Sequence, residues 1–356
     1  MNMHMPTRPA RLLGLGTAVP PHKLPQDLVK IVAGRILGAR YPDFERLSKS
    51  FTTSGIDTRY SVVPFEWFEE PKDWPQRTEA YLAGATALFV AAAEQALAAS
   101  GLRPEEIDTI VTVSTTGIAT PTLEARAMRQ MNFRPDVHRV PVFGLGCAGG
   151  VSGLSLAARL AATAPGSNVL LVCVETCTLS FRADRLQKAD IIATVLFGDG
   201  AAAACLSTDS DVAPAFGIGQ EHTWPDTLPI MGWEVDRDGF GVIFDRSIPE
   251  FVKQNFAAAT ERVLKQLGIE QVGLSRMICH PGGAKVVDAI EEALHLEQGS
   301  LDHERNVLRD YGNMSAPTAL FVLKRVAENA PEGDMLLAAL GPGFTASMLP
   351  IRFGRG

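Results

Sequence analysis

Three residues whose side chains together perform thiol chemistry stand in glycine-rich surroundings of this chain. Cys147 lies between two pairs of glycines, His280 precedes a Pro-Gly-Gly run, and Asn313 follows Tyr-Gly. A thiol is a nucleophile, an imidazole is a base that becomes a hydrogen-bond donor, and a carboxamide is a second donor for an oxyanion. Such a set suits the transfer of acyl groups through a thioester.

Cys147 and Asn313 occupy the same place in two copies of one sequence pattern. Residues 146–171 align without a gap on residues 312–337, a shift of 166 positions from 147 to 313. Identical residues align at several positions of this stretch, namely Gly146 with Gly312, Leu154 with Leu320, Arg159 with Arg325 and Ala164-Pro165 with Ala330-Pro331. A period this long exceeds those of solenoid repeats, and it indicates a duplicated domain.

A second stretch repeats with nearly the same shift. Residues 101–111 match residues 268–278, which puts Val113 opposite His280. Corresponding loops of two duplicated halves can meet at one cleft. We therefore expect the thiol, the imidazole and the carboxamide to come together there.

Strands and helices alternate along both halves, which we take as residues 1–207, carrying the cysteine, and 208–356, carrying His and Asn. Short β-branched runs predict strands, and longer Ala-rich or amphipathic segments predict helices. The expected strands are 11–17, 108–114, 140–143, 168–175, 201–206, 241–244, 277–280, 335–340 and 346–352. The expected helices are 78–100 with Thr78 as N-cap, one starting at Thr120-Pro121, 151–162, 248–267, 284–294 and 315–328. This alternation predicts an α/β protein with a parallel-rich sheet covered on both faces.

Bulk properties fit a globular enzyme and exclude other classes. The chain has 356 residues, 46% hydrophobic residues and a net charge of −7, so it offers no basic footprint for nucleic acid. Its apolar runs are too short for a transmembrane segment, and no signal-peptide core precedes Leu12. Five cysteines without a close-set framework indicate free thiols and a cytoplasmic protein. The histidines show no metal-ligand spacing, so we expect no metal and no cofactor, and we interpret Glu291, Glu292 and Glu297 as a solvated helical face.

The local sequence around Cys147 favours a reactive thiol. A cysteine at the first turn of a helix meets unpaired backbone N–H groups and the positive end of the helix dipole, so we expect its pKa to be depressed. The alternative is that it is one of five small buried thiols, which describes Cys173 and Cys205 well because they lie within apolar runs.

His280 and Asn313 also have ordinary structural interpretations. A lone histidine at the end of a strand is usually structural, and an asparagine at the start of a helix is usually an N-cap. The combination with Cys147 in loops related by duplication favours the chemical interpretation.

Five motifs resemble, in order and spacing, those of type III polyketide synthases, the chalcone and stilbene synthase family of the thiolase-fold superfamily. They are Gly-Cys-Ala-Gly-Gly at 146–150, Leu-Phe-Gly-Asp-Gly at 196–200, His-Pro-Gly-Gly at 280–283, Tyr-Gly-Asn-Met-Ser at 311–315 and Leu-Gly-Pro-Gly-Phe at 340–344. The similarity runs over essentially the whole chain. It implies a thiolase-like duplicated αβαβα layered fold, a homodimer, and acyl-CoA and malonyl-CoA as substrates.

The resemblance also implies roles for individual residues. Cys147 would carry the starter and the growing chain as a thioester, while His280 and Asn313 would stabilise the enolate formed when malonyl-CoA loses CO2. Further implied positions are Phe197 as gatekeeper between the CoA tunnel and the cavity, Ser315 and Gly341 at the cavity, Thr120 reaching into the partner's cavity, and Arg46 and Lys49 at the phosphates of CoA. Thr53 stands where many relatives carry a third basic residue.

The starter is expected to be a medium- or long-chain fatty acyl-CoA. Val242 stands where plant relatives with aromatic starters have a second phenylalanine, and Thr116 and Cys177 match places that could line a channel for an alkyl tail. Burial of such a tail contributes about 0.8 kcal/mol per methylene. We expect two or three malonyl extensions and an alkylpyrone or alkylresorcinol product, most like those of bacterial enzymes, with lactonisation and aldol closure both open.

Three alternatives stand beside this prediction. A ketoacyl-ACP synthase III also uses Cys, His and Asn, although that group typically has His-Gln-Ala-Asn where this chain has His-Pro-Gly-Gly at 280–283. A type III synthase with an aromatic or short starter is the second alternative. A non-catalytic acyl-binding protein on the same fold is the third.

Overall fold

The computed structural model describes residues 5–38, 41, 43–182, 185 and 187–354. Within this part of the chain the strands are β1 (Arg11–Ala18), β2 (His22–Pro25), β3 (Thr58–Ser61), β4 (Thr109–Val113), β5 (His138–Val142), β6 (Val169–Thr176), β7 (Asp199–Ser207), β8 (Ala215–Phe216), β9 (Gln220–Thr223), β10 (Met231–Asp236), β11 (Gly239–Phe244), β12 (Arg276–Cys279), β13 (Gly333–Gly341) and β14 (Thr345–Phe353). The helices are α1 (Gln26–Leu37), α2 (Phe44–Thr53), α3 (Trp74–Ser100), α4 (Leu123–Ala127), α5 (Gly149–Thr163), α6 (Lys188–Leu196), α7 (Ile248–Leu267), α8 (Ala284–Ala293), α9 (Asp302–Tyr311) and α10 (Ala316–Glu328).

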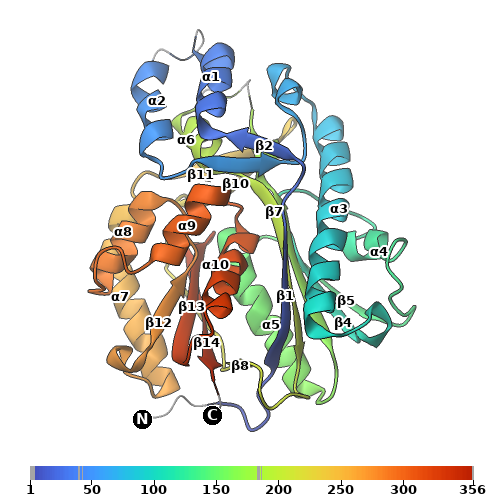
Figure 1. The fold of residues 1–356 in the computed structure, drawn as a ribbon. Helices are drawn as coiled ribbons and strands as arrows, with labels where there is room; N and C mark the ends of the chain where they lie inside the picture. The colour runs from blue at the N-terminus through green and yellow to red at the C-terminus, as the bar shows by residue number, and fades with distance from the viewer. Residues whose placement is uncertain (1–4, 39–40, 42, 183–184, 186, 355–356) are drawn as a thin grey trace.

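Among the described residues, ten strands form one sheet in the order β12-β13-β14-β8-β1-β7-β6-β4-β5, with β9 paired to β14 (Figure 1). The pairs β4–β5, β4–β6 and β12–β13 are parallel, while β6–β7, β1–β7 and β13–β14 are antiparallel. The expectation of a parallel-rich sheet is therefore wrong. The chain returns along β7 and β14 without a helix that crosses the sheet, and only such a crossover makes neighbouring strands parallel.

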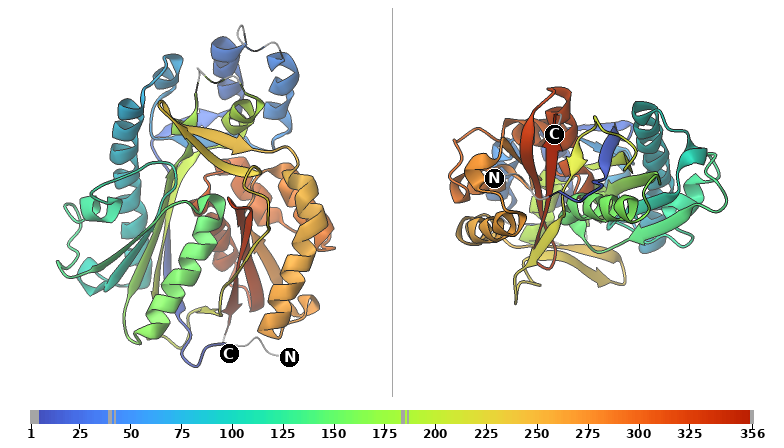
Figure 2. Two further views of the ribbon diagram at one scale, coloured as in Figure 1. Left: turned by 180° about the vertical axis from the view of Figure 1, so that it is seen from behind. Right: turned by 90° about the horizontal axis from the view of Figure 1, so that it is seen from below.

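The two parts of this one sheet lie on opposite sides of the central helices α5 and α10, with α3 outside one part and α7 and α8 outside the other (Figure 2). The elements therefore stack in five layers, as expected for a thiolase-like fold. Alternate residues of a strand face opposite sides of its sheet. Leu170 and Val172 of β6 accordingly pack with α3, whereas Leu171 packs with α5 and α10. On β13, Leu336 packs with α7 and α8, and Leu337 faces the central helices.

The two halves repeat the same arrangement around the central helices. A strand pairs in parallel and then antiparallel fashion as β4-β6-β7 in the first half and as β12-β13-β14 in the second. The corresponding helices α5 and α10 pack closely, because a Cβ on Gly150 would lie 2.2 Å from the carbonyl oxygen of Ala316. The sequence repeat is thus a structural repeat.

Two predicted helix starts differ from the structure in their N-terminal signal, while α5 and α10 begin at Gly149 and Ala316, within two residues of their predicted starts. α3 begins at Trp74, and its N-cap is Asp73, whose side chain forms a capping box with Gln76. The prediction of Thr78 as N-cap was wrong because the capping box lies a turn earlier. Thr120-Pro121 precedes a turn, and α4 begins only at Leu123.

α3 is long and apolar enough to cross a membrane by length and composition alone. In the structure it covers one face of the sheet, and Phe89, Ala92 and Ala96 along it are fully buried in the cluster that contains β6 and β7. A core helix of this kind passes the same compositional test as a membrane span.

Candidate active site

Cys147 lies in a 3-10 turn, Gly146–Ala148, that leads from β5 into α5. Two glycines let this turn pack against the β13–β14 connection. Gly146 has φ of +49°, and a Cβ there would lie 2.7 Å from Pro342 Cδ. A Cβ on Gly341 would lie 2.6 Å from the Ala148 nitrogen. The predicted role of Gly341 beside the cavity thus corresponds to a close backbone approach beneath the cysteine.

Asn313 stands next to Cys147, as the repeat predicts. The Cys147 Sγ lies 4.0 Å from Asn313 Oδ1, which also accepts a 2.8 Å hydrogen bond from the Ser315 amide. Asn313 Nδ2 donates to the Gly282 carbonyl at 3.1 Å. The backbone donor on one side and the carbonyl acceptor on the other fix the orientation of the carboxamide.

The N-cap interpretation of Asn313 is replaced by a different local role. α10 begins at Ala316 with Ser315 at the N-cap position, and Asn313 closes a turn two residues ahead. Its backbone also joins the loop that carries Phe197, through the Asn313 N–H to Leu196 and the Gly198 N–H to Asn313.

His280 follows β12 directly and is 4% exposed. Its backbone N–H donates to the Ala338 carbonyl on β13 at 2.8 Å. Neither ring nitrogen has a hydrogen-bond partner among the described residues. Burial lowers the pKa of His280 to about 3, because the apolar surroundings disfavour the charged imidazolium. The resting imidazole is therefore neutral, and both ring nitrogens remain available.

Burial also decides the state of Cys147, and it reverses the sequence expectation. Desolvation raises the pKa of the thiol to about 11, although its hydrogen bonds with Ser315 and with Asn313 Oδ1 act in the opposite direction. The buried Glu175 carboxyl also raises it. The predicted depression was wrong because the helix-terminus effect is smaller than the cost of burying a thiolate.

Glu175 is a member of the site that the sequence analysis missed. It is fully buried at the end of β6, and its Oε2 accepts hydrogen bonds from the Thr115 and Thr116 amides and the Thr116 hydroxyl, at 2.8–3.0 Å. Thr115 Oγ1 in turn accepts from the Gly146 amide at 3.1 Å. Burial raises the pKa of Glu175 to about 7. A carboxylate in an otherwise apolar strand was the signal for this residue.

Thr116 does not line the cavities beside Cys147 in the described chain, since its hydroxyl bonds to Glu175 and accepts from the Thr176 amide at 2.8 Å. Thr120 is exposed at the surface of the chain, away from these cavities.

Two small cavities adjoin at Cys177 and Phe197. The first, about 40 Å³, has walls from the cysteine turn, the β10–β11 hairpin and the start of α10, namely Cys147, Cys177, Phe197, Val242, Ser315, Trp233 and Pro342 among others. The second, about 60 Å³, lies beneath α1 and is almost wholly apolar, with Leu24, Val29, Val32, Ala33, Ile36, Phe65 and Phe68 in its walls. Cys177 and Phe197 belong to both walls and so form the boundary between them.

A larger cleft of about 470 Å³ opens between α2, α6 and α8. Lys188, Arg246 and Lys285 give it a cationic lining, and Ser50 and Thr53 face it from α2. Arg46 and Lys49 share the helical stripe of these two residues but are not part of the cleft wall, and Arg46 forms a 2.8 Å ion pair with Asp43. The cleft therefore has basic residues that the sequence analysis did not single out.

The described residues contain no group of three His, Cys, Asp or Glu side chains that could hold a metal ion. The five cysteines, all within this part of the chain, are free and buried.

Comparison with known proteins gives a consistent family. The model for the N-terminal domain of chalcone and stilbene synthases matches residues 2–210, and the model for their C-terminal domain matches residues 218–353. The 1,3,6,8-tetrahydroxynaphthalene synthase of Streptomyces peucetius subsp. caesius is 36% identical over 95% of this chain and 91% of that protein. Type III polyketide synthase A of Arabidopsis thaliana is 31% identical over 96% of this chain and 92% of that protein.

Solved structures show the same fold. The crystal structure of 1,3,6,8-tetrahydroxynaphthalene synthase from Streptomyces coelicolor A3(2), a bacterial type III polyketide synthase, superposes with a TM-score of 0.92. It is 26% identical in sequence, and the match covers 97% of this chain and all of that one. These matches do not support the ketoacyl-ACP synthase III alternative. Over nearly its whole length, the chain belongs to the chalcone and stilbene synthase family of type III polyketide synthases, which are condensing acyltransferases.

Proposed function

We propose that the protein performs iterative decarboxylative condensation of malonyl-CoA onto an acyl-CoA starter held on Cys147. The observation that carries this proposal is the arrangement of three neutral side chains. The Asn313 carboxamide lies 4.0 Å from the Cys147 sulfur and donates to the Gly282 carbonyl. The buried imidazole of His280 belongs to the same loop, two residues before Gly282.

The first step loads the starter. His280 takes the thiol proton as Cys147 attacks the acyl-CoA carbonyl, the C–S bond to CoA breaks, and the proton leaves with the CoA thiol. A raised thiol pKa does not prevent this, because the proton moves within the site as the sulfur attacks. Cys147 and His280 take up opposite charges only during the attack on a bound substrate.

The second step makes and uses the carbon nucleophile. Malonyl-CoA loses CO2 and leaves an enolate, whose oxygen His280 and Asn313 stabilise by hydrogen bonds. The enolate carbon attacks the acyl group on Cys147, the C–S bond to the enzyme breaks, and the extended chain leaves as a CoA thioester. Loss of one oxyanion donor costs about 100- to 1,000-fold in rate in other enzymes.

The cationic cleft supports CoA thioesters as the substrates. Lys188, Arg246 and Lys285 are suited to phosphate oxygens, and the cleft wall includes Gly282 and Gly283 beside His280. Arg46 and Lys49 lie on the same stripe of α2 as Ser50 and Thr53, beside the cleft wall, and we propose that their long side chains reach the same phosphates.

For the starter, we propose a medium- or long-chain fatty acyl group and an alkylpyrone or alkylresorcinol product. The apolar cavity beneath α1 supports this, because it adjoins the Cys147 cavity at Cys177 and Phe197 and its walls suit a hydrocarbon tail. Val242 lies in the wall of the Cys147 cavity and is 3% exposed, and its small side chain takes up less space there than an aromatic ring would.

A short starter is the second candidate. The cavity at Cys147 measures only about 40 Å³, and the Streptomyces relatives are named for a hydroxylated naphthalene, a product name without an alkyl chain. In that case the cavity beneath α1 would stay empty during the reaction.

Mass spectrometry of products from malonyl-CoA with acetyl-, hexanoyl-, decanoyl- and coumaroyl-CoA decides between them. The fatty-acyl proposal expects decanoyl-CoA to have the highest kcat/KM. A preference for acetyl-CoA, or products from malonyl-CoA alone, would establish the short starter instead. Cys147→Ala should form no acyl-enzyme and no product with any starter, and persistent acyl loading in that variant would refute the role of Cys147.

A further inference from the structure

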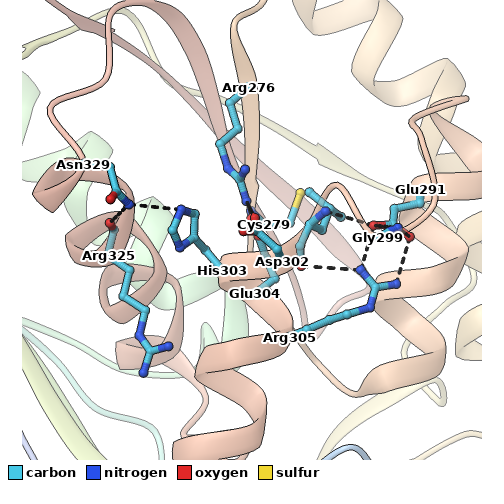
Figure 3. A network of polar contacts seen from close by, with 11 residues as sticks. Arg276, Cys279, Glu291, Gly299, Asp302, His303, Glu304, Arg305, Arg325 and Asn329 are labelled. Atoms are coloured by element: carbon cyan, nitrogen blue, oxygen red, sulfur yellow. Dashed lines mark hydrogen bonds and ion pairs between the residues drawn. The ribbon is translucent and has the colours of Figure 1, made fainter.

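We propose that Glu304 and Arg305, neighbours on α9, are positioning residues that hold His280 and Asn313 at a fixed separation. The inference rests on the proposed function, in which these two side chains stabilise one enolate oxygen together. Asn313 follows the C-terminal end of α9 by two residues. Figure 3 shows that Glu304 of α9 bonds to Cys279, which precedes His280, and that Arg305 bonds to Glu291, which follows it in the chain.

Glu304 binds the segment that precedes His280. The side chain is 0% exposed, and its Oε1 accepts a 2.9 Å hydrogen bond from the backbone N–H of Cys279. Its Oε2 accepts from Arg276 Nη2 at 2.8 Å. β12 is the last strand of the sheet among the described residues, so its outer N–H groups pair with no described strand. Glu304 supplies the missing acceptor one residue before the imidazole.

Arg305 binds the segment that follows His280. Its guanidinium forms two parallel hydrogen bonds to Glu291 of α8, at 2.7 and 2.8 Å, and a third to Asp288 at 2.7 Å. α8 begins at Ala284, only four residues after His280. Glu291 is 2% exposed, which corrects its interpretation as part of a solvated face.

The same carboxylate anchors the start of α9. Glu291 accepts hydrogen bonds from the amides of Gly299 and Leu301, at 2.9–3.1 Å. α9 is therefore tied to α8 through its own N-terminal loop as well as through Arg305. A bidentate Arg–carboxylate pair with backbone donors on the same oxygens has little freedom to rotate.

α9 transmits this position to Asn313. The helix ends at Tyr311, and Gly312, with φ of +68°, turns the chain into Asn313. From Glu304 to Tyr311 the helix rises about 10 Å at about 1.5 Å per residue. Because a helix is stiff over two turns, any displacement at Glu304 or Arg305 changes the separation between the imidazole and the carboxamide.

A purely structural role would be to cover the edge of β12 and to stabilise the fold. The two roles differ in which reaction step they affect. Of His280 and Asn313, loading of the starter onto Cys147 needs only His280. Decarboxylation needs His280 and Asn313 together, because both donate to the enolate oxygen. We call the hydrogen bonds of Glu304 to Cys279 and of Arg305 to Glu291 the clamp. Misplacement of a catalytic group by about 1 Å can cost about 100-fold in rate, so loss of the clamp should affect decarboxylation most.

The test uses Glu304→Leu, with Glu304→Gln as the conservative variant that keeps an acceptor for the Cys279 amide. Asp334→Leu is the matched control, because it breaks a partly buried ion pair with Arg352 at the other end of β13. We expect Glu304→Leu to lower kcat for malonyl-CoA decarboxylation about 10- to 100-fold, with KM unchanged. Acylation of Cys147 should fall by a smaller factor, because it depends on the position of His280 but not on its separation from Asn313. Glu304→Gln should recover most of kcat, and Asp334→Leu should affect both steps equally.

A double-variant cycle isolates the coupling. In an Asn313→Ala background one donor is already missing, so Glu304→Leu should cost little further decarboxylation rate. The same fold loss in both backgrounds, or equal losses of loading and decarboxylation, would overturn the clamp.

Alkylation of Cys147 by iodoacetamide tests the clamp without any CoA substrate. His280 accepts the thiol proton, so its displacement in Glu304→Leu should slow alkylation relative to both the wild type and Asp334→Leu. If the wild type does not decarboxylate malonyl-CoA, the proposed function fails, and this comparison alone decides the clamp. Equal alkylation rates in a folded Glu304→Leu protein would refute it.

Discussion

At the scale of single residues, burial determines the chemistry of the site more strongly than local sequence does. Cys147 and His280 are both neutral because their apolar surroundings penalise the charged form of each. In the proposed mechanism the thiol proton therefore passes to the imidazole during the attack on the substrate, with no thiolate beforehand.

His280→Gln should make the free energy of unfolding depend less on pH in the range below 6.5. The folded-state pKa of His280, about 3, lies below the unfolded value of 6.5. Between these values only the unfolded chain takes up the proton, so the histidine lowers the free energy of unfolding as pH falls below 6.5. Between pH 6.5 and 5.5 the wild type should lose up to about 1 kcal/mol more than His280→Gln.

Urea unfolding at each pH measures this difference. Glu175 and Asp199, whose pKa values burial raises to about 7 and about 6, titrate in the same range but are present in both proteins and cancel. Parallel stability curves for the two proteins would contradict a buried neutral imidazole.

The sequence could predict which residues meet but not their protonation. The repeat placed Cys147 and Asn313 together because duplicated halves put corresponding loops at the same end of their central helices. The direction of the thiol pKa shift is set first by burial, with smaller opposing effects of Ser315 and Glu175, which lie 168 and 28 positions further along the chain (315 and 175 against 147). Burial and neighbours from such distant positions are known only once the chain is folded.

At the scale of elements, the turn that carries Cys147, Gly146–Ala148, packs against the end of β13 at Gly341, which has no side chain. A methyl group at Gly341 would lie 2.6 Å from the Leu145 oxygen and from the Ala148 nitrogen, both backbone atoms. We expect Gly341→Ala to destabilise the protein by about 1–3 kcal/mol, the usual cost of overpacking. It should also lower the rate of Cys147 acylation, because the turn must shift.

Thermal unfolding and acylation rates check this expectation. Gly273→Ala is the control, because nothing lies within 4 Å of its added Cβ and its φ is not positive. A Gly341→Ala protein as stable and as active as Gly273→Ala would refute the tight contact.

The boundary between the two cavities offers a test of chain length. Cys177→Phe would fill the shared wall and should lower kcat/KM for decanoyl-CoA relative to acetyl-CoA by roughly 10-fold or more, the equivalent of about two methylenes at about 0.8 kcal/mol each. Competition between the two starters measures the ratio, and Cys177→Ala, which leaves the passage open, should keep the preference of the wild type. An unchanged ratio in a folded Cys177→Phe protein would mean that the tail takes another path.

Element boundaries were predictable where the terminal residues are distinctive. α7 runs over Ile248–Leu267 as expected, since Pro249 marks its start and Gly268, with φ of +68°, its end. The start of α3 was misplaced because Asp73 and Gln76 are common polar residues, and their mutual bonding shows only in three dimensions.

At the scale of the whole molecule, one end of the sheet is suited to a second copy of the chain. β5 is the last strand in the order, and its outer side pairs with no other described strand. Phe143, directly after β5, and Ile118, in the loop after the neighbouring β4, are 55% exposed each. We expect a homodimer in which Thr120 approaches the partner's cavity. Sedimentation at micromolar concentration should give twice the mass of 38.2 kDa, and an active monomer would contradict the proposal.

The mixed direction of the sheet was the main feature that the sequence could not predict. Strand–helix alternation usually implies parallel neighbours. Here β7 and β14 return without a crossover, and β1 inserts between β7 and β8, so its neighbours come from much later in the chain. Periodicity identifies strands but not their partners.

The position of β1 has a consequence for biosynthesis. Arg11 pairs with Ser207 and also with Ala215, so the first strand has no partner until about 200 further residues have been made. At about 5–20 residues per second a ribosome needs roughly 10–40 s for that length. During this interval β1, an apolar strand, is unpaired outside the ribosome. The nascent chain is therefore a candidate for chaperone binding, and we expect a fusion partner at its N-terminus to change the yield of folded protein.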